Sequence, residues 1–192
     1  MEQLQAKIRC WVAALAIVYV SLRSAGLGPT PISREVAMLV SAYCFFYIGF
    51  GAFILVHIQN HRGHYYWRRL LPMFGDYTSL AFIMIYGGQA SAAFFALIVW
   101  VTQGNGMRYG SNYLLIAALL SQLALLAVYL LSPHWHAQPE IMIAFSLTAL
   151  LAPIYAWSVL RQTAQARDAA VTAMQAKSRF LAQASHDLRQ PI

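Results

Sequence analysis

The sequence predicts an all-α fold, a polytopic membrane helical bundle that continues into a cytoplasmic coiled-coil helix. The first observation is composition: of 192 residues, 60% are hydrophobic and only 10% are charged, whereas soluble domains carry about 45–50% apolar and about 25% charged residues. The second is that apolar stretches approaching the roughly 20 residues of a membrane helix follow one another with short breaks. The third is a polar, helix-favouring segment after the last stretch, with no Gly and no Pro before Pro191.

Six membrane spans are predicted. The clearest is Val36–Ile58, which is apolar or small throughout and contains no charged residue. The other five are Cys10–Leu22 with its flanks, Leu70–Tyr86, Gly87 or Ala90 to about Gln103, Tyr113–Leu131 and Ile141–Leu160. Breaks rich in Gly and Pro separate them, among them the turn predicted at Gly104-Asn105-Gly106. Five spans are the alternative, in which the first segment, short and interrupted by Arg23, does not cross.

The charge pattern predicts the orientation. With six spans both termini share one side, and Lys and Arg are concentrated on cytoplasmic loops. The side of the termini holds Lys7, Arg9, Arg62, Arg68, Arg69, Arg108, Arg161, Arg167, Lys177, Arg179 and Arg189. The opposite side holds only Arg23 and Arg34. We therefore expect a bacterial inner-membrane protein with cytoplasmic termini, and we attribute the net charge of +7 to topology and not to a nucleic-acid partner.

The polar tail carries a heptad pattern. Positions spaced alternately by four and three residues are Leu160, Ala164, Arg167, Val171, Met174, Ser178, Leu181, Ser185 and Leu188. Such a seam is typical of a two-stranded coiled coil. It favours a parallel homodimer over a helix lying on membrane lipids, because a surface helix needs a broader apolar face.

The tail ends in a motif with chemical meaning. In Phe180-Leu-Ala-Gln-Ala-Ser-His-Asp-Leu-Arg-Gln-Pro191, a carboxylate directly follows His186. It can hold one imidazole nitrogen protonated and leave the other as a nucleophile towards a phosphoryl group. The string resembles the phosphoacceptor box of sensor histidine kinases. That resemblance implies that His186 is phosphorylated and that Asp187 is its acid/base partner. Gln190 stands where the family has a Thr or Asn that positions water for dephosphorylation, which puts phosphatase activity in doubt.

The printed sequence stops at Ile192, before the second helix of the dimerisation hairpin and before any ATP-binding segment. We therefore expect no cofactor in this stretch, ATP and Mg²⁺ only in a kinase domain outside it, and no autophosphorylation by this chain alone.

Three further blocks carry a second resemblance: LPMFGDYTSLAFIMIYGGQAS from Leu71, WVTQGNGMRYGSNYL from Trp100, and LSPHW ending at Trp135. Together with the tail, over roughly residues 70–192, they resemble RpfC-like hybrid sensor histidine kinases. Because the composition becomes polar after Leu160, we expect a transmembrane sensor domain over 1–160, followed over 161–192 by a cytoplasmic signalling helix and the start of the dimerisation and phosphotransfer hairpin. The resemblance to RpfC-like kinases implies a cis-2-unsaturated fatty-acid quorum signal, downstream receiver and phosphotransfer domains, and a response regulator.

Asp76 is the carboxylate predicted inside a span, and it needs a partner because an unpaired charge there is costly. The first hypothesis pairs it with Arg108. The alternative is a ligand head-group site of Arg108, Tyr109, Asn105 and Asn112, with an acyl slot between the spans, since arginine binds carboxylates bidentately. A second possible head-group site on the opposite side comprises Arg23, Arg34, His134 and His136.

Other patterns are weaker. His57, His61 and His64 share a helical face, but no carboxylate or cysteine completes a metal or haem site, so we expect no metal. Both cysteines lie in apolar stretches and are predicted to be buried thiols and not a disulfide. The competing function from another class is a small six-span transporter or channel, for which an intramembrane Asp is permissible.

Overall fold

The computed structural model describes residues 2–28, 30–61 and 66–187, and every regular element in them is helical. This confirms the all-α prediction. The elements are α1 (Glu2–Ser24), α2 (Arg34–Asn60), α3 (Trp67–Gly87), η1 (Gly88–Ser91), α4 (Phe94–Tyr109), α5 (Ser111–Leu131), α6 (Pro133–His136) and α7 (Pro139–Asp187).

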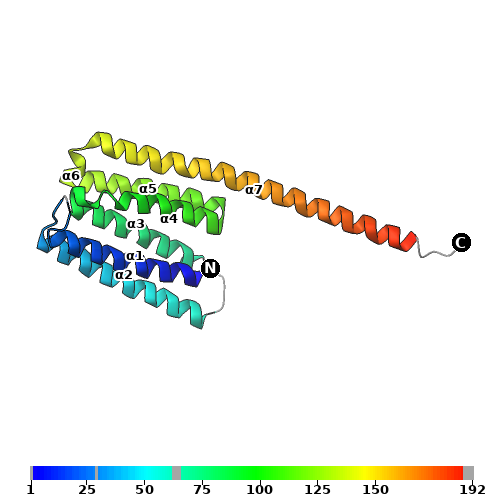
Figure 1. The fold of residues 1–192 in the computed structure, drawn as a ribbon, viewed down its shortest axis with the longest axis horizontal. Coiled ribbons are helices and arrows are strands. Elements are labelled where there is room, and N and C mark those ends of the chain that lie inside the picture. The colour runs from blue at the N-terminus through cyan, green and yellow to red at the C-terminus, as the bar shows by residue number, and fades with distance from the viewer. Residues whose placement is uncertain (1, 29, 62–65, 188–192) are drawn as a thin grey trace.

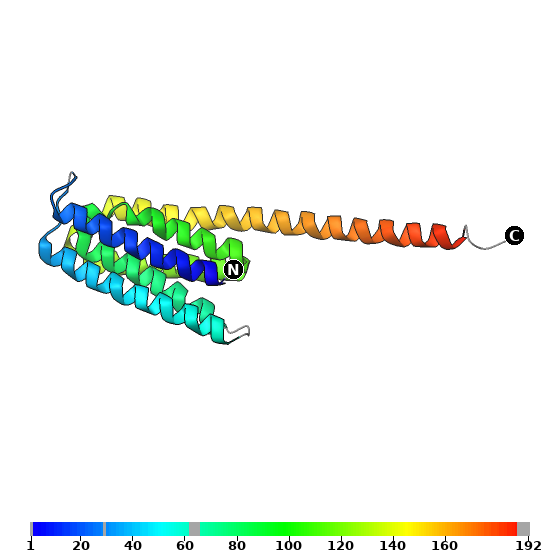
Figure 2. The same ribbon diagram turned by 60° about the horizontal axis from the view of Figure 1, so that its bottom comes forward.

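The long helices lie side by side, and each runs antiparallel to the one before it (Figures 1 and 2). At one end of the bundle, α1 begins and α7 leaves; we call this the exit end (Figure 1). At the other, the far end, lie the α1–α2 connection, η1 and α6. The start of the chain and its polar tail are therefore on the same end of the bundle.

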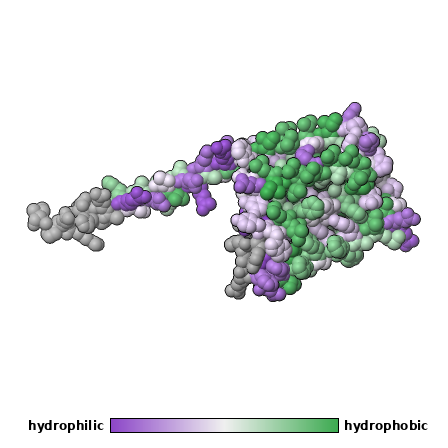
Figure 3. Space-filling view, turned by 180° about the vertical axis from the view of Figure 1, so that it is seen from behind, coloured by the Kyte–Doolittle hydropathy of each residue, from purple (hydrophilic) through white to green (hydrophobic). Residues whose placement is uncertain are grey.

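Five helices of the described chain are long and apolar enough to cross a membrane, namely α1, α2, α3, α5 and α7. In the five-span alternative the first segment does not cross the membrane, but α1 is long and apolar enough to do so. The helix that is too short for this set is α4, with 16 residues. Helix α4 still runs from the far end to the exit end within the bundle (Figure 1), so six helices pack together. On the face shown in Figure 3, apolar side chains cover the middle of the bundle and polar ones gather at its ends and along α7.

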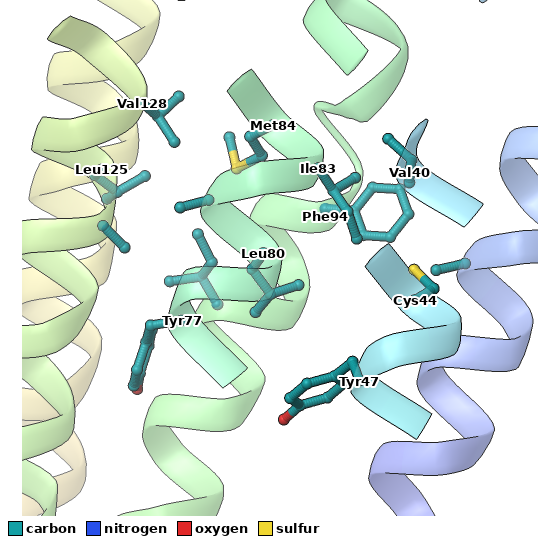
Figure 4. Close-up of a cluster of buried hydrophobic side chains, with 14 of the residues drawn as sticks. Val40, Cys44, Tyr47, Tyr77, Leu80, Ile83, Met84, Phe94, Leu125 and Val128 are labelled. Atoms are coloured by element: carbon teal, nitrogen blue, oxygen red, sulfur yellow. The ribbon is translucent and has the colours of Figure 1, made fainter. Parts of the chain in front are cut away.

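Helix α3 occupies the centre of the bundle and packs against α2, α4 and α5. Its buried Leu80, Ile83 and Met84 form the core between neighbouring helices (Figure 4). Trp135 on α6 is 1% exposed, and its indole N–H donates to the carbonyl of Met84 at 2.9 Å. Although a Trp near a span end commonly belongs to an interfacial belt, Trp135 instead anchors the far end to the core.

Small residues bring neighbouring helices close together. A Cβ on Gly51 would lie 3.1 Å from the Cys10 sulfur, so this glycine lets α1 approach α2. Cys44 is buried, as predicted, whereas Cys10 is half-buried; both thiols are free.

The predicted turn at Gly104-Asn105-Gly106 is instead helical, because α4 continues to Tyr109. A Cβ on Gly106 would lie 2.6–3.0 Å from three side-chain atoms of Leu114, so Gly106 serves the close packing of α4 on α5. The chain turns at Gly110, whose φ of 94° is the left-handed region that glycine tolerates.

Helix α7 is continuous over 49 residues and passes through the buried Pro153. Two contacts hold its first half to the bundle. The Gln122 amide of α5 donates to the Ser146 carbonyl at 3.1 Å and accepts from the Ser146 hydroxyl. The rings of Phe95 on α4 and Phe145 on α7 stack at 4.0 Å with an interplanar angle of 7°. The polar second half of α7 extends alone beyond the exit end (Figure 1).

Candidate ligand-binding cavity in the membrane bundle

A partly open cavity lies between α1, α2, α3 and α4. Each helix contributes one face, at helical spacings. The lining residues include Gln5, Arg9, Val12, Asp76, Phe94, Trp100, Asn105 and Arg108. The rest of the lining is mainly apolar, so the site resembles a slot for an apolar molecule with a few polar groups.

An ion pair crosses the cavity from α1 to α3. The Arg9 guanidinium donates to both carboxylate oxygens of Asp76, with Nε at 2.8 and 3.0 Å and Nη2 at 2.9 Å. The two side chains are only 12% and 9% exposed. The Tyr47 hydroxyl of α2 donates to the same carboxylate. Asp76 is therefore neutralised and hydrogen-bonded within the bundle, as an intramembrane carboxylate must be.

The predicted Asp76–Arg108 pair is wrong, because Arg9 occupies the position of the partner. Arg108 lines the same cavity, but its guanidinium lies back over Gly104, where a Cβ would be 3.8–3.9 Å from three guanidinium atoms. Side chains on a helix point towards its N-terminus, and α4 ends at the exit end, so Arg108 points into the bundle. Neither an ion pair nor a hydrogen bond to Arg108 is present within the described part of the chain.

The other members of the predicted head-group set separate. Asn105 lines the cavity and is 2% exposed, with its amide donating to the Val101 carbonyl at 2.9 Å. Tyr109 instead donates to the Gln5 side chain of α1 and does not line the cavity. Asn112 is exposed at the start of α5. The structure thus brings Arg108 and Asn105 together and leaves the other two outside.

The sequence reasoning missed Gln5, Arg9 and Tyr47. Arg9 was considered only as one of the positive charges that set the orientation in the membrane. The predicted first span began at Cys10, whereas α1 begins at Glu2. Ala13 and Ala16, four and seven positions after Arg9, lie on the same helix face as Arg9 and are buried. This spacing could have indicated that Arg9 faces the bundle interior.

The alternative outer site is not assembled around one cavity. Arg23 donates to the Thr30 hydroxyl within the α1–α2 connection, and Arg34 is exposed. His134 contacts Gln138 at 3.2 Å, and the His136 ring stacks on Tyr129 at 4.7 Å. Both pairs lie at the far end, and among the described residues no hydrogen bond, ion pair or ring contact joins the arginines to the histidines.

Outside the cavity, His186 and Asp187 form the end of the described part of α7. Gln190 and His64 lie outside the described residues. His57 and His61 stack on each other at 4.4 Å. Within the described ranges no group of three or more His, Cys, Asp or Glu is placed to hold a metal ion.

Two curated proteins match the chain, both named "Sensory/regulatory protein RpfC", from Xanthomonas campestris pv. campestris strains ATCC 33913 and 8004. Each is 43% identical over 125 residues, which is 65% of this chain but 17% of the relative. The chain thus spans less than a fifth of the length of the curated relatives it matches. No family model matches, and no solved structure matches significantly. The findings establish an all-α membrane helical bundle that is similar, over about two thirds of its length, to part of a sensory and regulatory protein.

Proposed function

We propose that this chain is the membrane input region of a two-component sensor histidine kinase. The observation that carries the proposal is α7, one unbroken helix that begins inside the bundle and ends at His186-Asp187. No other folded domain intervenes between the membrane part and the motif in the described chain. The similarity to a sensory and regulatory protein supports the same assignment.

In this proposal His186 is the phosphoacceptor and Asp187 is the acid/base partner that orients its imidazole. A parallel homodimer would form along the tail, where the seam residues Val171, Met174 and Leu181 are 46%, 71% and 54% exposed. Burial of those side chains against a second copy would remove apolar surface from water and so stabilise the dimer. ATP, Mg²⁺, the receiver and phosphotransfer domains and the response regulator would then act on the cytoplasmic side.

The proposed signal is a cis-2-unsaturated medium-chain fatty acid, received from the membrane. A largely apolar cavity with an arginine at one end suits an alkyl chain with a carboxylate. A transporter would use the same cavity, but it has no use for a phosphoacceptor motif on a helix leaving the bundle.

The test uses the intact protein that carries this chain, reconstituted in vesicles with ATP and Mg²⁺. Acid-labile phosphate should form on the wild type, change in amount with a cis-2-unsaturated dodecenoic acid, and respond less to its trans isomer. His186→Gln should abolish labelling, whereas Ser185→Ala should retain it. Phosphate retained on His186→Gln, or uptake of the acid into vesicles without any effect on labelling, would contradict the proposal.

A further inference from the structure

We propose that one face of α7 has two partners that exclude each other: the bundle of its own chain and the α7 of a second copy. While α7 is docked as a straight helix, the seam at Val171, Met174 and Leu181 is turned to the side on which its own bundle lies. A second copy then has room on the opposite face of the tail. The inference rests on the proposed function for the homodimer, and it adds which face of the tail the second copy contacts.

The first observation is the face of α7 that the bundle covers. Met142, Ala149 and Pro153 are buried. Ser146, on the same side, is hydrogen-bonded to α5. Leu151, on the other side, is 60% exposed. The spacings of four, three and four residues from Met142 to Pro153 form one stripe along a helix, and this stripe faces α4 and α5.

The second observation is that the seam of the tail continues this stripe. Val171 follows Pro153 by 18 residues, which is about five full turns at 3.6 residues per turn. Met174 follows the half-buried Ala156 by the same 18 residues. Helix α7 is unbroken over this stretch and shows no sharp bend in either view (Figures 1 and 2). Both seam residues therefore point to the side on which the bundle lies.

The third observation is what occupies that side. Packed helices lie about 8–10 Å apart, so a parallel partner helix on the seam would lie at this distance, on the bundle side of the tail. Continued straight towards the far end, it would run into α4 and α5, which pack against α7. The clash is mutual, because a two-fold axis relates two identical copies. Pairing through the seam therefore requires α7 to turn about its axis or to leave its place on α4 and α5.

The opposite face of the tail meets no such obstacle in the described chain. Its residues follow one another at spacings of four, three and four: Ala169, Ala173, Ala176 and Phe180. Phe180 is 71% exposed. Ala176 follows Met174 by two residues and so points about 200° away from it, at about 100° per residue. A second copy on this face leaves each bundle on the outside of the pair.

Disulfide cross-linking of the intact protein in membrane vesicles compares the two faces. Met174→Cys and Ala176→Cys are the matched pair, and the protein without an added cysteine is the control for its own thiols. A disulfide needs Cα atoms about 4.4–6.8 Å apart, and residues on the outer sides of a helix pair are farther apart than this, so Ala176→Cys should form at least about 5-fold more linked dimer than Met174→Cys.

Weaker docking should expose the seam. Gln122→Ala removes both hydrogen bonds between α5 and Ser146. Dimer formation by Met174→Cys should then rise at least about 5-fold, the equivalent of about 1 kcal/mol. Leu119→Ala, at a 62% exposed position of the same helix, should leave it unchanged.

A change in the tail alone tests the same inference without altering the bundle. Two residues inserted after Ala166 turn the tail by about 200°, so Met174→Cys should then form more dimer than Ala176→Cys. Seven inserted residues keep the phase, so the order of the protein without an insertion should remain.

The inference is wrong if Met174→Cys forms as much dimer as Ala176→Cys without an insertion, or if two added residues leave their order unchanged. The homodimer of the proposed function would stand in both cases. If neither cysteine forms a dimer in any variant, the copies do not meet along the tail, and the homodimer and this inference are both wrong. If the order reverses as expected but His186 carries no phosphate, the faces are as inferred and the kinase function is wrong.

Discussion

At the scale of single residues, two arginines in one cavity have opposite roles. Arg9 is satisfied by Asp76 across the bundle, whereas Arg108 lies over Gly104 with no partner among the described residues. A paired charge contributes to the stability of the fold, because removal of one partner leaves the other buried and uncompensated. The guanidinium of Arg108, without such a partner, makes no comparable contribution to the stability of the fold and is available to a ligand.

This contrast gives a stability prediction. Arg9→Gln and Asp76→Asn should each lower the free energy of unfolding in detergent by about 3 kcal/mol. The double variant should cost less than the sum of the two, since both remove the same interaction. Arg108→Gln, the matched control in the same cavity, should change it by less than about 0.5 kcal/mol. Additive effects of Arg9→Gln and Asp76→Asn would mean that the two side chains do not interact.

The sequence predicted correctly that Asp76 is paired. Arg108 and Asn105 of the predicted head-group set line the cavity, and their role in binding a ligand stays a prediction. It assigned the wrong partner to Asp76. Depth along a span can be counted from the sequence, but which neighbouring helix faces Asp76 depends on how six helices pack. Arg9 was hidden for the same reason: a charge near a span end is usually at the interface, and only tertiary contact shows that this one points inward.

At the scale of elements, α4 is the wall shared by the cavity and the output helix. Phe94 lines the cavity on one face, and the neighbouring Phe95 stacks on Phe145 of α7 on another. The short 3₁₀ helix η1 precedes α4, so its far end is joined to α3 by a tight connection and not by a long rigid helix. We expect a displacement of α4 by a ligand to reach α7 through this aromatic pair.

The coupling can be tested at Phe145. Phe145→Leu should leave binding of the cis-2-unsaturated dodecenoic acid within about twofold of the wild type, because Phe145 does not line the cavity. It should reduce the ligand-induced change in His186 phosphorylation about 2- to 10-fold, the equivalent of a stacked pair of about 0.5–1.5 kcal/mol. Leu147→Ala, 51% exposed on the same helix, is the control. An unchanged response in Phe145→Leu would exclude this pair as the route.

The boundaries of the elements were predictable where apolar runs are long, as in α2 and α5, and less so where polar residues have tertiary partners. The first helix begins earlier than its apolar run because Gln5 and Arg9 are bonded inside the bundle. The fourth continues through a glycine-rich stretch because Gly106 packs against Leu114. In both cases the packing of a neighbouring helix overrides the local signal.

At the scale of the whole molecule, the bundle and the motif are joined by one helix. The 49 residues of α7 extend about 74 Å at 1.5 Å per residue, and only the first half contacts the bundle. A rotation or tilt of that half is therefore transmitted along the exposed half towards His186. The dimer seam at Val171 and Met174 would convert such a motion into a change in how the two α7 helices of a dimer pack against each other.

This rigid transmission predicts the effect of insertions after Ala166. Two added residues turn everything beyond them by roughly 200°, at about 100° per residue, and bring a different face of the tail towards the partner. The intact protein should then be fixed in a high or a low state of His186 phosphorylation, whatever ligand is present. Seven added residues keep the heptad phase, so the ligand response should remain. Both variants should bind the cis-2-unsaturated dodecenoic acid as the wild type does, because the cavity between α1, α2, α3 and α4 is far from the insertion. If both insertions keep the ligand response, α7 does not act as a rigid rod, and the signal must pass through flexibility in the tail or through contacts outside this chain.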